Sequence, residues 1–191
     1  MKNNNEVVIL KSLQSFFNAL CDNIGENSSR EGLSQTPQRI LQSYQTLFEG
    51  YTKNPKTVLG AVFKEGLCDE MVIAKDIEFY SMCEHHLLPF FGHISIGYIP
   101  NQHLAGISSL AKLVEVFARR LQIQESLTEQ IAQCLLESLE PKGVIVVCEA
   151  HHLCVSMRGV QKNPTIITSA LRGLFKTDSR TRAEFMQLIK A

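Results

Sequence analysis

The sequence of 191 residues has no excess of charge of either sign, because nineteen basic residues balance nineteen acidic ones. No overall field therefore draws the protein to nucleic acid or to an anionic membrane, and any anion site must be local. The sequence also lacks an apolar run of the roughly 20 residues that a membrane span requires, and its polar start lacks the apolar stretch of a secretory signal. These absences predict a cytoplasmic protein with neither nucleic acid nor a membrane as a partner.

The chain contains no polar low-complexity tract and no internal repeat, and 45% of its residues are hydrophobic, which suffices for one substantial core. Near the start, apolar residues recur at helical spacing from Val7 to Leu20. A second helix is expected from Thr36, as N-cap, to about Phe48, with Pro37 in its first position. We therefore expect an N-terminal helical arm over residues 1–70 and a second domain over residues 71–191.

The second domain alternates between strand-like and helical patterns. Strands are predicted at 71–82, 93–99, 144–148, 153–157 and 165–168, and helices at 108–121, 126–139 and 180–189. This order predicts an α+β fold in which an antiparallel sheet is backed by helices.

Cysteines and histidines cluster in a way that indicates metal chemistry. Six cysteines in a chain of this length without a secretory signal favour thiolate chemistry over disulfides. All six histidines lie between His85 and His152, and four form two adjacent pairs, each within three residues of a cysteine. Cys83 and His86 can point at one ion at the end of a predicted strand, and Cys154, from a distant strand, could supply a third ligand.

Cys148 is the obvious fourth ligand, but an extended run would place it roughly 20 Å from Cys154, too far for one metal. Three protein ligands would leave a fourth position open, as in catalytic zinc sites, although a structural zinc site or no metal fits the composition nearly as well. The remaining cysteines read as small buried hydrophobes: Cys21, Cys68, Cys134 and Cys148.

Two histidines are predicted beside the ion. On a strand, His152 would share a face with Cys154, and His85 adjoins His86. Two thiolates would cancel the formal charge of Zn²⁺ and weaken it as a Lewis acid, so nearby imidazoles are needed to move protons near neutral pH.

Several motifs together resemble the signature of the type I GTP cyclohydrolases. The core of the resemblance is the run Ser-Met-Cys-Glu-His-His-Leu-Leu-Pro-Phe at Ser81–Phe90, followed by Gly97–Pro100. It extends from about Gly32 to the C-terminus through 36–39, 122–128, 152–159, 173–175 and 181–185.

The resemblance implies the tunnelling fold, with residues 71–191 as the catalytic domain, in which sheets from several subunits join into a barrel. It implies a toroidal homodecamer of two pentamers with active sites between subunits, and GTP as the substrate. It implies that zinc is held by Cys83, His86 and Cys154. The implied substrate-binding residues are Glu125, Ser108 and Gln124 at the guanine edge, Arg158 and Lys112 at the triphosphate, and Arg39 from a neighbouring subunit.

The implied reaction begins when water activated by zinc adds to the imidazole-ring carbon of guanine while His152 protonates a ring nitrogen. Formate is released, His85 assists opening of the ribose, and an Amadori rearrangement with ring closure gives 7,8-dihydroneopterin triphosphate, a precursor in pterin and folate biosynthesis. A carboxylate at Glu125 suits guanine because it can accept from two neighbouring N–H groups.

The chain departs from the family pattern at the phosphate end. Ser109 and Lys112 stand where members usually carry Lys and, three residues later, Arg, and Gln42 stands where Lys is common. Fewer fixed cations should weaken triphosphate binding. Two alternatives remain at this point: a tunnelling-fold enzyme acting on another purine or pterin, and a zinc-stabilised scaffold that binds nucleotide without turning it over.

Overall fold

The structure is a computed structural model that describes residues 4–60, 62–63 and 69–190. The chain divides into two compact units, Met1–Phe48 and Glu49–Ala191. The functional division predicted at residue 70 stays a prediction. Among the described residues no helix is both long enough and apolar enough to cross a bilayer.

The first unit is a pair of helices, α1 (Asn4–Ile24) and α2 (Thr36–Leu47), that pack against each other. Both predicted helices are confirmed. The predicted cap is wrong, because Thr36 is already helical, Gln35 occupies the cap position, and no side chain caps the helix. Pro37 in the first turn lacks an N–H group, so one of the donors that a cap would satisfy is absent.

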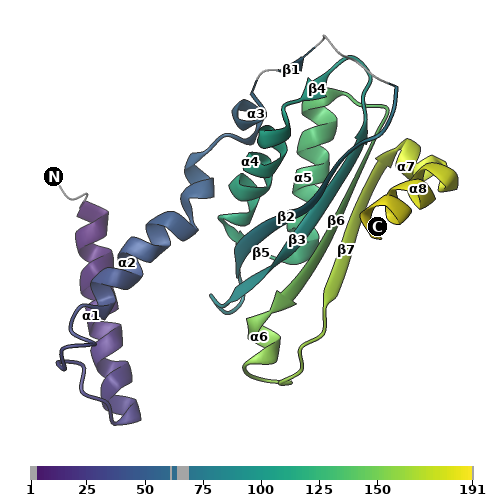
Figure 1. Ribbon diagram of the computed structural model, residues 1–191. Helices are drawn as coiled ribbons and strands as arrows, with labels where there is room; N and C mark the ends of the chain where they lie inside the picture. The colour runs from purple at the N-terminus through teal and green to yellow at the C-terminus, as the bar shows by residue number, and fades with distance from the viewer. Residues whose placement is uncertain (1–3, 61, 64–68, 191) are drawn as a thin grey trace. The chain divides into compact units, whose positions relative to one another are not determined.

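The second unit is built on a five-stranded sheet in the order β5-β2-β3-β6-β7 (Figure 1). Four strands are antiparallel neighbours: β2 (Val72–Cys83), β3 (Pro89–Ile99), β6 (Gly143–His152) and β7 (Ile166–Gly173). The short strand β5 (Leu121–Gln122) runs parallel to the end of β2, at Met82 and Cys83. A separate pair joins β1 (Val62–Phe63) to β4 (Leu104–Ala105). The predicted α+β class with an antiparallel sheet is confirmed.

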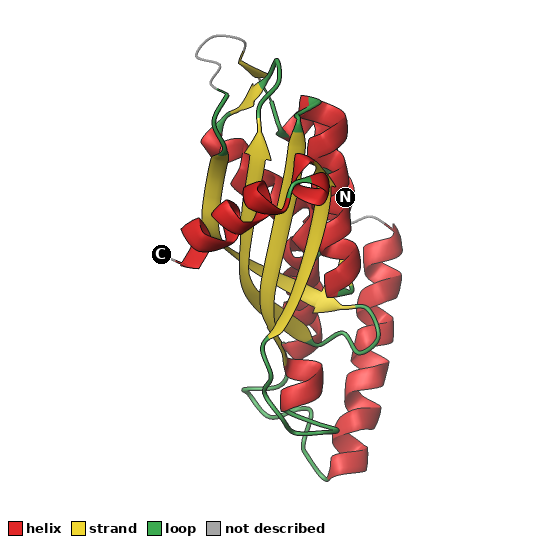
Figure 2. Cartoon of the chain, turned by 90° about the vertical axis from the view of Figure 1, so that its right-hand side faces the viewer, coloured by secondary structure: helices red, strands yellow, loops and turns green. Residues whose placement is uncertain are grey.

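Helices cover both faces of this sheet. The helices α4 (Ile107–Ala118) and α5 (Gln124–Leu139) bury the larger core on one face, with Leu113 and Ile131 fully buried. On the other face, α7 (Leu174–Thr177) and α8 (Ser179–Lys190) lie against the sheet (Figure 2). Their Phe175 and Phe185 are fully buried in a second, smaller core there. Two short segments, η1 (Glu49–Thr52) and α3 (Pro55–Val58), pack against α4.

The predicted strand at 153–157 is wrong, because Leu153–Ser156 forms the short helix α6. The cause lies in the sheet: β6 pairs with β3 only as far as His152, opposite Phe90, and β3 begins one residue earlier at Pro89. Beyond that point the chain has no neighbouring strand, so its backbone groups turn to each other, and Met157 N donates to Leu153 O at 3.1 Å. This local change decides where Cys154 lies.

Candidate metal centre and active site

The connection between β2 and β3 folds Cys83 and His86 toward each other. The carbonyl of Cys83 accepts from the backbone N–H of Leu87 at 3.0 Å, and Leu87 adopts a positive φ of 51°. The N–H of Cys83 donates to Leu88 O at 2.9 Å, which closes the loop. As a result, Cys83 Sγ lies 3.7 Å from Nδ1 of His86.

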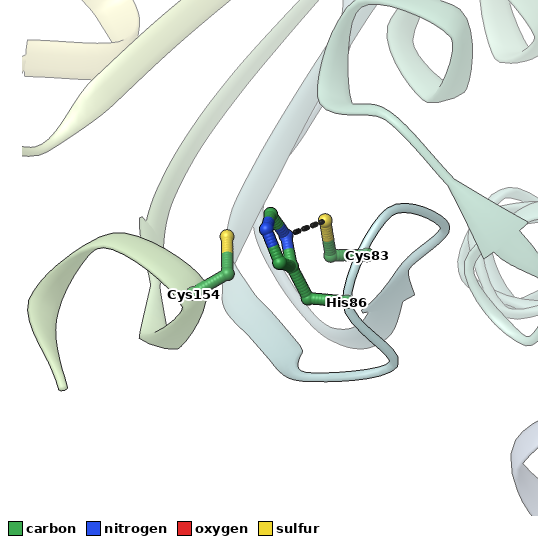
Figure 3. A group of neighbouring side chains, drawn as sticks. All are labelled: Cys83, His86 and Cys154. Atoms are coloured by element: carbon green, nitrogen blue, oxygen red, sulfur yellow. Dashed lines mark hydrogen bonds between the residues drawn. The ribbon is translucent and has the colours of Figure 1, made fainter. Parts of the chain in front are cut away.

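Cys154 completes a group of three possible ligands (Figure 3). Because Cys154 lies on helix α6, its side chain points back toward the β2–β3 loop, and the three ligand atoms all lie within 4.8 Å of one another. Tetrahedral zinc, with bonds of about 2.3 Å to sulfur and 2.0 Å to nitrogen, would hold such atoms about 3.5 to 3.8 Å apart. The group therefore fits a zinc ion after a small inward movement of the side chains.

The electrostatics of the two thiols also suits a cation. Burial raises the pKa of Cys154, and the adjacent Cys83 raises it further, whereas Arg158 acts weakly in the opposite direction. A positive charge beside the Cys154 thiol would favour its thiolate, which is the form that binds metal. The donor set thus favours a divalent ion of the zinc type.

Cys148 lies outside this group. It is fully buried beneath α5, and burial raises the pKa of its thiol to about 12. Cys21 and Cys134 are likewise buried, while Cys68 lies outside the described residues.

His152 ends β6 and immediately precedes α6. Its ring stacks on Phe90 with 4.7 Å between centroids and 1° between planes. Its Nε2 lies 2.7 Å from Oε1 of Gln124. Burial lowers the pKa of His152, the Glu125 carboxylate opposes that effect, and His151 adds slightly to it. The ring is held in place and favours its neutral form.

His85 is open to solvent beside the proposed ligand His86. The two rings meet edge to face at 6.2 Å, and His85 Nε2 lies 3.7 Å from Oε1 of Glu84. The catalytic role of His85 stays a prediction.

Three more predicted residues lie at this end of the sheet. β5 pairs with Cys83, so α5, which follows β5 directly, begins here with Gln124 and the exposed Glu125 in its first turn. Arg158 is exposed in the turn after α6, close enough to Cys154 to influence its pKa.

Two other predicted substrate residues, Ser108 and Lys112, lie in the same unit as the metal group but away from it. Only the C-terminal end of α4 leads to β5 and Cys83, and Ser108 lies about 15 Å from that end along the helix axis. Lys112 lines a separate cavity of about 490 Å³ between α4 and the η1–α3 segment, together with Glu49 and Lys53. Arg39 is exposed on α2, in the first compact unit.

Two features of the site were not predicted: the stack of His152 on Phe90, and the bond between His152 and Gln124. The stack follows from the register that pairs β3 with β6, which no local pattern reveals. The sequence did contain a signal for the bond between His152 and Gln124. Gln124 begins the buried face of α5 that continues through Leu127 and Ile131, and a polar residue on such a face needs hydrogen-bond partners.

Comparison with known proteins gives a consistent result. The model of the GTP cyclohydrolase I family matches residues 13–190. GTP cyclohydrolase 1 of Helicobacter hepaticus is 58% identical over 189 residues, which cover 99% of this chain and 92% of that protein. The proteins of the same name from Helicobacter pylori (strain G27) and Helicobacter acinonychis are each 58% identical over 180 residues, covering 94% of this chain and all of theirs.

Proposed function

This chain belongs to the GTP cyclohydrolase I family, and from that premise we propose that it hydrolyses the guanine imidazole ring of GTP. The products are formate and 7,8-dihydroneopterin triphosphate. The structural observation that carries the proposal is the group of Cys83, His86 and Cys154, set at the same end of the sheet as His152 and Glu125. A cytoplasmic location stays a prediction.

The group would hold one Zn²⁺ through two sulfurs and one nitrogen, and three protein ligands leave a fourth position open. Bound there, zinc supplies Lewis-acid chemistry that makes water nucleophilic near neutral pH.

The chain's own residues would then bind the purine and move protons. The Glu125 carboxylate can accept from two neighbouring N–H groups of guanine, a pairing that adenine does not offer. Because His152 favours its neutral form, its unprotonated nitrogen can first accept a proton from the water that adds to the ring carbon and then pass it to the purine nitrogen. His85, exposed beside His86, is free to reach the ribose, and the Arg158 guanidinium is free to meet phosphate oxygens.

We further propose that complete sites form between copies of the chain in a ring, as in the decamer that the family resemblance implies. Within the described residues, β7 pairs with β6 alone, and most of the outer edge of β2 has no partner because β5 covers only Met82 and Cys83. Open edges of this kind pair readily with another chain, and a closed barrel removes them. Neighbouring copies would supply Ser108, Lys112 and Arg39. Within one chain, Ser108 and Lys112 lie on α4 away from the metal group, and Arg39 belongs to the other compact unit.

The deciding experiment incubates the purified, zinc-loaded protein with GTP. We expect formate and a pterin triphosphate in equal amounts, the pterin detected by its fluorescence after oxidation and by mass. Formate without pterin would restrict the function to ring opening. Neither product from a folded, zinc-loaded protein would contradict the proposal and favour a nucleotide-binding scaffold.

A further inference from the structure

The side-chain amide of Gln124 has only one orientation that satisfies its surroundings. The residue is 2% exposed, and its Nε2 donates to Cys148 O at 3.0 Å and to Ile166 O at 2.9 Å. An amide has two N–H donors on nitrogen and only acceptor sites on oxygen. The reversed orientation would press its oxygen against two carbonyl oxygens, so both donors are used and Oε1 is the atom that faces His152.

This orientation determines which nitrogen of His152 carries the proton. Because the amide oxygen can only accept, the 2.7 Å contact requires His152 Nε2 to donate. The ring cannot tilt freely, since its face lies flat on Phe90, which is itself fully buried. The neutral ring therefore has one free nitrogen, Nδ1.

We propose that Gln124 is a positioning residue that holds His152 as the Nε2–H tautomer and leaves Nδ1 to exchange a proton with the substrate. The inference rests on the proposed function and assigns Gln124 a role other than the guanine contact implied by family resemblance. All polar atoms of the Gln124 side chain are already bonded within the chain. The amide therefore has no donor left for a purine, and its oxygen, held against the His152 ring, keeps one acceptor site; the experiment below tests whether guanine uses that site.

Two roles for Gln124 make different kinetic predictions. A positioning residue acts only through His152, so its loss lowers the rate of ring opening and leaves GTP affinity unchanged. Groups that orient a metal-binding histidine typically contribute about 10- to 100-fold, and we expect a factor of the same order for Gln124 acting on His152. If Gln124 instead contacts guanine, its loss would weaken GTP binding whether or not His152 is present.

The test is a double-mutant cycle of Gln124→Met with His152→Ala in the full-length, zinc-loaded protein. Methionine keeps the length of the side chain and removes its polar atoms. We expect Gln124→Met alone to slow formate release about 10- to 100-fold, with KM for GTP and zinc content unchanged. In the His152→Ala background it should cause no further loss of rate, and the Kd for GTP, measured by equilibrium binding to these slow variants, should not change.

A matched control separates positioning from packing. Thr128 lies one turn further along the same buried face, where its hydroxyl donates to Gln124 O at 2.8 Å and lies 2.6 Å from Oγ1 of Thr168. Thr128→Val should lower the thermal unfolding midpoint and leave the rate of formate release almost unchanged. A loss of rate as large as that of Gln124→Met would assign the effect to packing and overturn the inference.

Other outcomes also decide the question. An equal loss of rate in the His152→Ala background, or a weaker Kd for GTP in both backgrounds, would overturn the inference and make Gln124 a substrate contact. If Gln124→Met does not fold, Gln124→Leu, which also lacks the amide atoms, takes its place in the same cycle and should likewise slow only proteins that retain His152. The unmodified protein is assayed in the same series. If it releases formate from GTP but the double-mutant cycle gives another result than expected, only the inference about Gln124 is overturned. If it releases no formate, the proposed function and the inference are both overturned.

Discussion

At the scale of single residues, the three proposed zinc ligands differ in depth: Cys83 is buried, Cys154 half-buried and His86 exposed. Each supplies one of only three protein ligands, so removing either thiolate leaves too few donors to hold the ion. Cys148 offers a control of the same residue type, because it lies close in sequence and is buried outside the group.

We therefore predict about one zinc per chain in the unmodified protein and in Cys148→Ala, and little zinc in Cys83→Ala and Cys154→Ala. Metal analysis of the purified proteins measures this directly. Full zinc occupancy in both ligand variants would show that the ligand set is wrong.

A second prediction at this scale concerns the missing phosphate-binding cations. Ser109→Lys together with Gln42→Lys should lower KM for GTP and make it more dependent on salt, and Arg158→Ala should raise it. Each charge-assisted contact contributes about 1 to 3 kcal/mol when partly desolvated, and less when the phosphates stay hydrated. Steady-state kinetics at two salt concentrations measures the change. Unaltered KM at low salt would mean that other residues neutralise the triphosphate, or that the preferred substrate carries none.

At the scale of elements, the site depends on how closely β3 and β6 approach. Gly92 in β3 pairs with Ala150 in β6, and a Cβ at Gly92 would lie only 2.8 Å from Ala150 Cα and closer still to the carbonyl oxygen of Glu149. Both obstacles are backbone atoms, so the strands themselves would have to separate. The next pair on this face of the ladder is Phe90 with His152, the stacked rings of the site.

Gly92→Ala should therefore destabilise the protein by about 1 to 3 kcal/mol, lower the thermal unfolding midpoint, and slow formate release by disturbing the His152 ring. Gly32→Ala is the matched control, because the nearest atom to its new Cβ is the flexible end of Arg30 at 3.0 Å. In calorimetry and the formate assay, this control should have nearly the same unfolding midpoint and rate of formate release as the unmodified protein. Equal midpoints for the two variants would show that β3 and β6 separate without cost.

At the scale of the whole molecule, sites shared between copies predict complementation. A chain with Cys154→Ala lacks a zinc ligand, and a chain with Ser108→Ala and Lys112→Ala lacks residues that lie at a distance from its own metal group. Each should be inactive or weak alone. In rings mixed at random, about a quarter of the sites would receive both intact parts.

Co-expression of the two chains with different tags, followed by purification over both, should thus restore about a quarter of the activity per site. Rings assembled from two chains that both carry Cys154→Ala serve as the control and should stay inactive. No recovery in mixed rings would place Ser108 and Lys112 in the same site as the zinc ligands of their own chain, or outside the site.

The sequence by itself determined what depends on neighbours along the chain. The spacing of Cys83 and His86 at a strand end, the adjacent His85, and the main helices and antiparallel strands follow from local periodicity and ligand chemistry. The family resemblance rests on the same short runs of residues. These features could be predicted because a turn or a strand brings such residues together regardless of the rest of the fold.

Only the tertiary structure decided the relations between distant segments. Helix α6 forms because β6 loses its neighbour at His152, and that helix, not a strand, aims Cys154 at the β2–β3 loop. The bond from His152 to Gln124 and the stack on Phe90 likewise depend on the register of β3 with β6 and on the docking of α5. Register and docking result from packing over the whole sheet, so no local run of the sequence contains them.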